Sequence, residues 1–167
     1  MVTSTAITLD GQPFRLGVLA LCNFGRPGDL CLPGGQRAAS PAGPGPENGP
    51  ENGSVIVVMA TDIPLEHRQL ARVIRRGGVG IARLGSFWGH GSGDVFIGFS
   101  TANRTPVAAS SDLLPMRRLA EPRIDRLFEA MADATGSAVL DALMSAGTTT
   151  GRAGHVRQGL REALEQP

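Results

Sequence analysis

Ser54 stands at the boundary between two very different stretches of sequence. The segment before it, 33–53, is rich in glycine and proline, whereas SVIVVMAT (54–61) is a continuous apolar run typical of a buried strand. Such a strand would hold Ser54 rigidly, while Gly53 could adopt strained dihedral angles, including a positive φ. In that geometry the Ser54 hydroxyl can attack the carbonyl carbon of Gly53. Hydrolysis of the resulting ester would release a new N-terminal serine.

A serine released in this way would carry its own general base. The α-amine of a chain has a pKa of about 7.7–8, close to the value at which a general base works best. One residue would then supply both nucleophile and base, as an N-terminal threonine does. The residues alone leave a simpler alternative open, because a serine that begins a strand after a linker is usually a turn residue.

The glycine-rich segment GSFWGHGSG (85–93) offers other chemistry. His90 could serve as a base, but His67, His90 and His155 are too few and too scattered for a Ser-His-Asp triad, and the GxSxG motif is absent. His67 is expected to be solvated. The loop could instead cradle a phosphate, which would make a small nucleotide-binding module, although the chain has no lysine to complete a P-loop.

The composition excludes several classes of function. Arginine accounts for all 16 basic residues and tyrosine is absent, so no lysine or phenol can act as nucleophile, base or acid. The net charge is +1 and the arginines are spread along the chain, which argues against nucleic-acid binding. No apolar run is long enough for a membrane span, so we expect a cytoplasmic protein. Cys22 and Cys31 are expected to be plain thiols, and no metal or other cofactor is expected.

The elements that would position these residues indicate helices packed on a sheet, in an α/β or α+β class. We expect strands at 16–22, 54–61 and 94–100, the second of them buried on both faces. A helix should start at 62–64 and continue past residue 80. A long amphipathic helix is predicted at 122–146, with a short helix in the tail. The apolar face of the first helix is formed by Leu70, Val73, Ile74, Gly77, Ile81 and Leu84.

Four segments together resemble the L-aminopeptidase/D-esterase family, which includes the β-aminopeptidases. They are GVLALCNFG (17–25), NGSVIVVMATDIPL (52–65), IARLGSFWGHGSGDVFIGFST (81–101) and DALMSAGTTTGRAGH (141–155). Their order and spacing match the family, and the resemblance covers residues 16 to about 160. It implies an autoprocessing serine hydrolase of the N-terminal-nucleophile type. Such an enzyme would cut N-terminal residues from small peptides, amides or esters.

The resemblance also implies the role of each site residue. The family is cut before the serine of its GS-strand motif, which falls on Gly53 and Ser54. The oxyanion-hole asparagine falls on Asn23, whose amide could donate to the developing oxyanion. The family's Ser-Gly-acid motif falls on Ser92 and Asp94. Their side chains would hold the nucleophile and the α-ammonium group.

The resemblance further implies a partial αββα-type sandwich, of the aminopeptidase/ornithine acetyltransferase-like kind, that lacks its upstream strands. Residues 1–32 would end the α-subunit-like part, 33–53 would be the linker, and 54–167 the β-subunit-like catalytic part. Relatives are about twice as long and assemble from αβ heterodimers into higher oligomers. The alternative to an active enzyme is a truncated, non-catalytic paralogue or a split subunit that needs an upstream partner chain.

Overall fold

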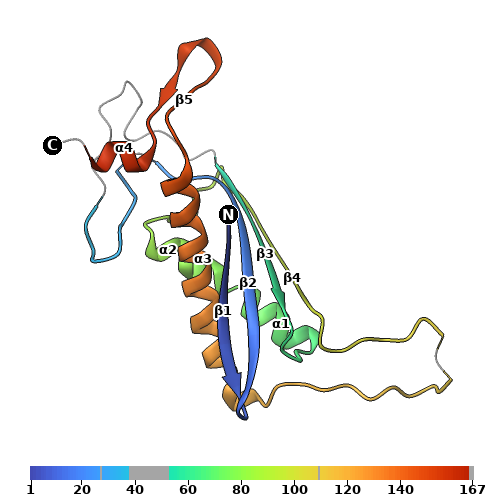
Figure 1. Cartoon of the computed structure of the whole chain (residues 1–167). Coiled ribbons are helices and arrows are strands. Elements are labelled where there is room, and N and C mark those ends of the chain that lie inside the picture. The colour runs from blue at the N-terminus through green and yellow to red at the C-terminus, as the bar shows by residue number, and fades with distance from the viewer. Residues whose placement is uncertain (27, 38–52, 109, 166–167) are drawn as a thin grey trace.

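The computed structural model describes residues 1–26, 28–37, 53–108 and 110–165, which form an α+β fold (Figure 1). The strands are β1 (Val2–Leu9), β2 (Gln12–Asn23), β3 (Ser54–Thr61), β4 (Gly93–Ser100), β5 (Thr149–Thr150) and β6 (Val156–Arg157). The helices are α1 (His67–Ile74), α2 (Gly77–Arg83), α3 (Asp125–Ser145) and α4 (Leu160–Leu164), with 3-10 turns at Glu121–Arg123 and Arg152–Gly154. The predicted class of helices packed on a sheet is confirmed.

The main sheet has the order β1-β2-β3-β4. β1 pairs with β2 and β2 with β3 in antiparallel register, whereas β3 and β4 are parallel. Asp10 and Gly11 join β1 to β2 with φ angles of 47° and 75°, both in the left-handed region required by a two-residue type I′ turn. β1 was not among the elements predicted from the sequence, although VTSTAITL followed by Asp-Gly carries a hairpin signal.

The helices of the described ranges cover only one face of this sheet. α3 contacts β1 and β2 and runs beside them in Figure 1, and α1 contacts β4. Along β3, Val55, Val57 and Met59 are buried against the helices, whereas Ile56 on the opposite face is 40% exposed. The prediction that β3 is buried on both faces is therefore wrong, because the described residues place no layer over the second face.

The first helix begins later than the sequence pattern suggested. The Thr61 hydroxyl accepts a hydrogen bond from the Ile63 N–H at 3.1 Å, and the Ser100 hydroxyl donates to the Ile63 carbonyl at 2.7 Å. These bonds hold the segment after β3 in a non-helical conformation. α1 starts at His67, where the Glu66 N–H donates to the Gln69 side chain in a capping box.

The predicted helical stretch is divided into α1 and α2 by a break at Arg75 and Arg76. α2 then crosses α3 at very short range. A β-carbon built on Gly80 would lie 2.3 Å from the carbonyl oxygen of Ala132, so only glycine allows this approach. The long helix was predicted as 122–146 and is found as α3 after a 3-10 turn. Its apolar face packs on the core, where Leu127, Met131, Thr135, Ala138 and Val139 are buried.

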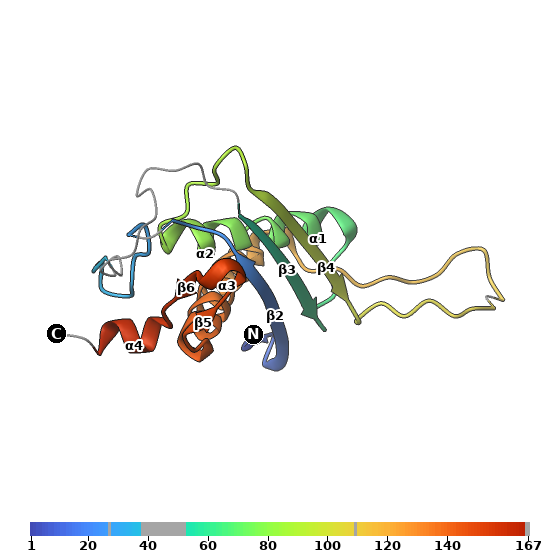
Figure 2. The ribbon, with the colours of Figure 1, turned by 90° about the horizontal axis from the view of Figure 1, so that it is seen from above.

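Two extensions leave the body at opposite ends (Figures 1 and 2). Residues 101–108 and 110–118 belong to a long loop at one end, and the β5–β6 hairpin and α4 lie at the other. α4 corresponds to the short helix expected in the tail. Of the predicted linker 33–53, residues 38–52 lie outside the described part. Among the described helices, none has the length and apolar character needed to cross a membrane.

Candidate active site

The sheet register brings three predicted site segments to one edge. Asn23 is the last residue of β2, Ser54 the first of β3 and Gly93 the first of β4. Asn23 is paired with Ser54, and Ser54 with Gly93. Paired residues on neighbouring strands project from the same face, so Asn23 and Ser54 share the face that no helix covers.

The carbonyl oxygen of Gly53 receives two hydrogen bonds. The Ser54 hydroxyl donates to it at 2.7 Å, and the backbone N–H of Gly93 donates at 3.1 Å. The Ser54 oxygen is therefore held directly beside the carbonyl group that it would have to attack. Two donors on one carbonyl oxygen also polarise the C=O bond and make its carbon a better electrophile.

Both glycines at this edge make close contacts, and those of Gly53 require a glycine. A β-carbon built on Gly53 would lie 2.5 Å from the Asn23 carbonyl oxygen and 2.5 Å from the Phe24 Cα. A β-carbon on Gly93 would lie 3.3 Å from the Ser54 hydroxyl oxygen. The first contact is with backbone, which cannot rotate away, so the Gly53–Ser54 bond is fixed tightly against the end of β2.

Asn23 presents a free side-chain amide beside this bond. The residue is exposed, and within the described ranges its side chain makes no hydrogen bond. An amide group with no internal partner keeps two N–H donors available for a ligand. The geometry therefore leaves Asn23 free to donate to a negatively charged oxygen that forms near Ser54.

Ser92 and Asp94 are joined to each other rather than to Ser54. The Ser92 hydroxyl donates to the Asp94 carboxylate at 2.9 Å, and both residues are half-buried. Strand alternation places Asp94 on the helix-covered face, opposite the Ser54 side chain. In the described part of the chain no hydrogen bond links this pair to the Ser54 hydroxyl, whose bond goes to Gly53. Asp94 nevertheless lies on β4, the strand paired with the one that Ser54 begins, and Ser92 directly precedes that strand.

The loop that precedes β4 is held in place by close packing. A β-carbon on Gly78 would lie 2.3 Å from the Trp88 ring, so glycine makes room for the indole. The Trp88 ring also packs against Phe96, with 5.7 Å between centroids. At the start of the loop Gly85 has φ +101°, and a β-carbon there would meet the Asp29 carbonyl oxygen at 1.8 Å. These contacts fix the path of residues 85–92 towards Ser92.

The histidines and cysteines contribute little to this site. His67, His90 and His155 are each exposed, and His67 is solvated as expected. Burial raises the pKa of the Cys22 thiol, which lies on the helix-facing side of β2 and therefore remains protonated at neutral pH. Among the described residues no group of three or more His, Cys, Asp or Glu side chains could hold a metal ion.

Sequence reasoning missed the backbone donor at Gly93. Its N–H acts on the Gly53 carbonyl through the parallel pairing of β3 with β4. The available signal was a glycine at the start of a predicted strand, which often marks a close backbone approach. The identity of the partner carbonyl depends on which strands pair, and the motif does not contain that information.

Comparison with known proteins places the chain in a known family. Residues 2–157 match peptidase family S58. The chain is 34% identical to a β-peptidyl aminopeptidase of Sphingosinicella microcystinivorans, over 96% of this chain and 44% of that protein. The chain therefore spans less than half the length of this curated relative.

Two solved structures are also similar to this chain. An L-aminopeptidase D-Ala-esterase/amidase from Ochrobactrum anthropi, described as a variant of the Ntn hydrolase fold, superposes with a TM-score of 0.81 and 31% identity. This covers 98% of the chain and 46% of that structure. A protein from Pyrococcus horikoshii superposes with a TM-score of 0.79 and 39% identity, over 98% of this chain and 45% of the other.

Proposed function

Because this chain belongs to peptidase family S58, we propose that it is the serine-nucleophile part of an aminopeptidase that activates itself by cutting the Gly53–Ser54 bond. The observation that carries this proposal is the pair of hydrogen bonds on the Gly53 carbonyl oxygen, from the Ser54 hydroxyl and the Gly93 N–H. A reactive hydroxyl beside a polarised peptide carbonyl is the arrangement that an internal acyl shift needs.

The self-cleavage step begins with attack of the Ser54 hydroxyl oxygen on the Gly53 carbonyl carbon. The new C–O bond gives a tetrahedral oxyanion, and the bond from that carbon to the Ser54 nitrogen then breaks. The hydroxyl proton passes to the departing nitrogen, which becomes a free amine. Water hydrolyses the remaining ester, leaving a carboxylate on Gly53 and restoring the Ser54 hydroxyl.

The Gly93 N–H would assist this step throughout. It already donates to the oxygen that becomes the oxyanion, at 3.1 Å, and it belongs to a paired strand that cannot reorient freely. Removing a fixed donor of this kind by mutation typically raises the barrier by about 3–4 kcal/mol. The Ser54 hydroxyl gives up its own bond to the same oxygen as it attacks.

After cleavage, Ser54 would act on substrates with its hydroxyl as the nucleophile and its α-amine as the base. Its α-amine takes the proton from its hydroxyl, and the oxygen attacks the substrate carbonyl to form an acyl-enzyme. The free amide of Asn23, on the same face of the sheet, donates to the oxyanion. The amine returns the proton to the leaving amine or alcohol, and water then releases the acid.

Ser92 and Asp94 would position the α-amine. A main-chain amine lies in the plane of the sheet, so groups on the neighbouring strand can reach it even when their side chains start on the other face. The Ser92 hydroxyl orients the Asp94 carboxylate by a 2.9 Å hydrogen bond. A carboxylate near the amine stabilises the ammonium that forms when Ser54 is deprotonated.

The substrates proposed are small peptides, amides and esters with a free N-terminal residue. The support comes from the relatives, whose names describe a β-peptidyl aminopeptidase and an L-aminopeptidase with D-Ala esterase and amidase activity. The cytoplasmic location and the assembly of αβ heterodimers into a higher oligomer stay predictions.

Mass spectrometry of the purified chain tests the proposal. We expect a fragment that begins Ser-Val-Ile-Val to accumulate during incubation. Ser54→Ala should stay intact, Ser54→Thr should be cut because it keeps a hydroxyl, and Ser110→Ala at an exposed loop position should behave like the parent chain. Loss of cleavage in Ser110→Ala, or continued cleavage at this bond in Ser54→Ala, would contradict the role given to Ser54.

The uncovered face of the sheet supports the alternative of a subunit that needs a partner chain. Seven apolar side chains on this face are at least 40% exposed, namely Val2, Leu19, Leu21, Ile56, Val95, Ile97 and Phe99. An apolar patch of this extent usually marks an interface. The proposed partner is a second polypeptide layer that packs here and walls the substrate site beside Ser54.

Size-exclusion chromatography separates these two alternatives. If the chain needs a partner, it should self-associate when purified alone and remain uncut. Ile97→Glu and Phe99→Glu should then reduce self-association, whereas Ser110→Glu, at an exposed loop position, should not. A monodisperse, cleaved and active monomer would exclude the need for a partner.

A further inference from the structure

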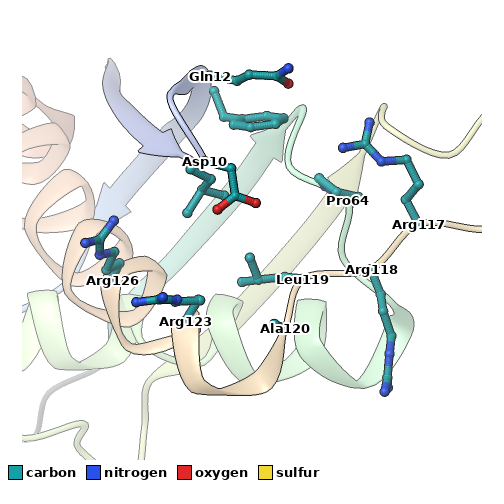
Figure 3. A pocket seen from close by; sticks show the side chains of 11 residues that line it. Asp10, Gln12, Pro64, Arg117, Arg118, Leu119, Ala120, Arg123 and Arg126 are labelled. Atoms are coloured by element: carbon teal, nitrogen blue, oxygen red, sulfur yellow. The ribbon is translucent and has the colours of Figure 1, made fainter.

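We propose that a second site, at the end of the sheet opposite Ser54, binds a small oligophosphate. A cavity of about 570 Å³ lies there between the β1–β2 hairpin, the segment after β3 and the start of α3 (Figure 3). β3 has eight residues, and at ~3.3 Å per residue this places the cavity roughly 25 Å from Ser54. The site is thus separate from the proposed catalytic chemistry.

Of the described residues that line this cavity, four are arginines and one is acidic. The arginines are Arg117, Arg118, Arg123 and Arg126, and the acidic residue is Asp10. The whole chain has a net charge of only +1. The concentration of positive charge at this one place is therefore a local feature and does not reflect the overall composition.

Of these four arginines, three form no ion pair within the described ranges. Arg118 forms an ion pair with Glu66 at 3.5 Å and extends away from Asp10 in Figure 3. Arg126 donates one hydrogen bond, to the Thr8 carbonyl at 3.2 Å, which anchors its side chain and leaves its other donors open. Within the described ranges, the side chains of Arg117 and Arg123 form no hydrogen bond or ion pair.

The spread of these groups favours a chain of phosphates over a single ion. Arg123 and Arg126 lie on the side of the cavity that carries Asp10, whereas Arg117 lies on the side of Pro64 (Figure 3). One phosphate engages one or two guanidinium forks, whereas these arginines are divided between two sides of the cavity. A pyrophosphate or triphosphate has several oxyanions along its length, and its charge matches the excess of arginine.

The surrounding structure adds to this preference. The cavity opens beside the start of α3, a 21-residue helix whose N-terminal backbone carries partial positive charge. Leu9, Phe14 and Leu119 give the cavity an apolar wall. This wall could also hold the organic part of a nucleoside polyphosphate, so the shared recognition element is the phosphate chain.

A substitution at Asp10 should change the affinity for the ligand in the opposite direction from substitutions of the arginines. Its carboxylate would repel the ligand, so Asp10→Asn should tighten binding. Asp10 has φ 47° in the hairpin turn, a conformation that asparagine tolerates at least as well as aspartate. The change therefore removes charge while leaving the turn intact.

Isothermal titration with pyrophosphate, at constant ionic strength and with the full chain, tests the site. We expect saturable binding of one ligand per chain. Combined Arg123→Gln and Arg126→Gln should weaken it at least tenfold, Arg117→Gln alone should weaken it severalfold, and Asp10→Asn should strengthen it. Arg161→Gln, at an exposed position in α4, is the matched control and should change nothing.

Titration with further ligands distinguishes an inorganic oligophosphate from a nucleotide as the source of the phosphate chain. ATP binding with the same dependence on these arginines would indicate a nucleotide, and binding of pyrophosphate alone would indicate an inorganic ligand; both support the site. Equal binding of citrate would overturn the preference for phosphate. Absence of saturable binding, or equal loss in Arg161→Gln, would overturn the site. Circular dichroism of each variant checks that it is folded. Arg117→Gln, at an exposed position, gives a second test of the site that does not depend on the folding of the double variant.

Discussion

Asn23 and Ser54 are directly opposite each other on antiparallel strands, at the edge of the sheet where β2 ends and β3 begins. Residues opposed in this way have Cα atoms about 4.5–5.5 Å apart and side chains on the same face. One amide donor and one hydroxyl can therefore act on the same carbonyl group. The pairing also presses the Asn23 backbone against Gly53, which ties the position of the bond to be cut to the donor beside it.

Asn23→Ala should slow hydrolysis without unfolding the protein. Loss of an oxyanion donor typically reduces kcat by about 10²–10³-fold, with little change in KM. Asn23 is exposed and its side chain has no hydrogen bond within the described part, so the unfolding midpoint should stay unchanged. Hydrolysis of an amino-acid p-nitroanilide by the cleaved chain measures the effect. An unchanged kcat would show that Asn23 has no such role.

Gly53→Ala should delay self-cleavage. The new β-carbon would meet backbone atoms of Asn23 and Phe24 at 2.5 Å, so the scissile bond must move away from its present position. We expect at least a tenfold slower appearance of the Ser-Val-Ile-Val fragment in a time course by mass spectrometry. Gly151→Ala is the matched control, because its β-carbon would make an ordinary contact of 3.6 Å. Equal rates in the two variants would remove the argument from close packing.

Two glycines at the crossing of α2 and α3 should respond in opposite ways. Gly80→Ala forces a methyl group to within 2.3 Å of the Ala132 carbonyl oxygen, and should destabilise the protein by about 1–3 kcal/mol. Gly136→Ala makes only a 3.7 Å contact in the interior of α3 and should stabilise it by about 0.5–1 kcal/mol. Urea unfolding of both variants measures the difference, and changes of the same sign would contradict the packing described here.

Glu121 should contribute stability that depends on pH. The Arg72 guanidinium at 2.6 Å, and then the Gln69 amide at 3.0 Å, hold the pKa of the Glu121 carboxyl below its ordinary value of 4.5. A lowered pKa in the folded state means that the ionised form is stabilising above pH 4.5, and that this gain is lost as the pH falls through the folded pKa.

Glu121→Gln should therefore lower the thermal midpoint at pH 7, and its effect should shrink as the pH falls below 4.5 through the lowered pKa of the folded state. Because the Glu121 and Arg72 side chains are partly exposed, the difference should be small and should shrink further in high salt. Thermal unfolding of both proteins across this pH range is the measurement. A difference that grows on acidification would have the wrong sign for this ion pair.

The local pattern was enough to predict several elements and their limits. β3 begins at Ser54 and ends at Thr61 as expected, because the change from glycine and proline to β-branched residues is abrupt. The start of α1 was misplaced, because hydrogen bonds from Thr61 and Ser100 override the helix signal of 62–64. β1 was not predicted because its residues alternate between polar and apolar, without the continuous apolar run that marks β3.

By itself the sequence determined which residues could react, since the type of a side chain and its neighbours along the chain set its chemistry. It placed a serine after a glycine at the start of an apolar strand, and it placed a serine and an acid around Gly93. Only the tertiary structure decided that Gly93 donates to the Gly53 carbonyl, that Ser92 bonds to Asp94, and that arginines gather at the far end. These relations depend on which strands pair and in what register. Strand pairing and register are set by backbone hydrogen bonds between distant segments, and no local sequence pattern encodes those bonds.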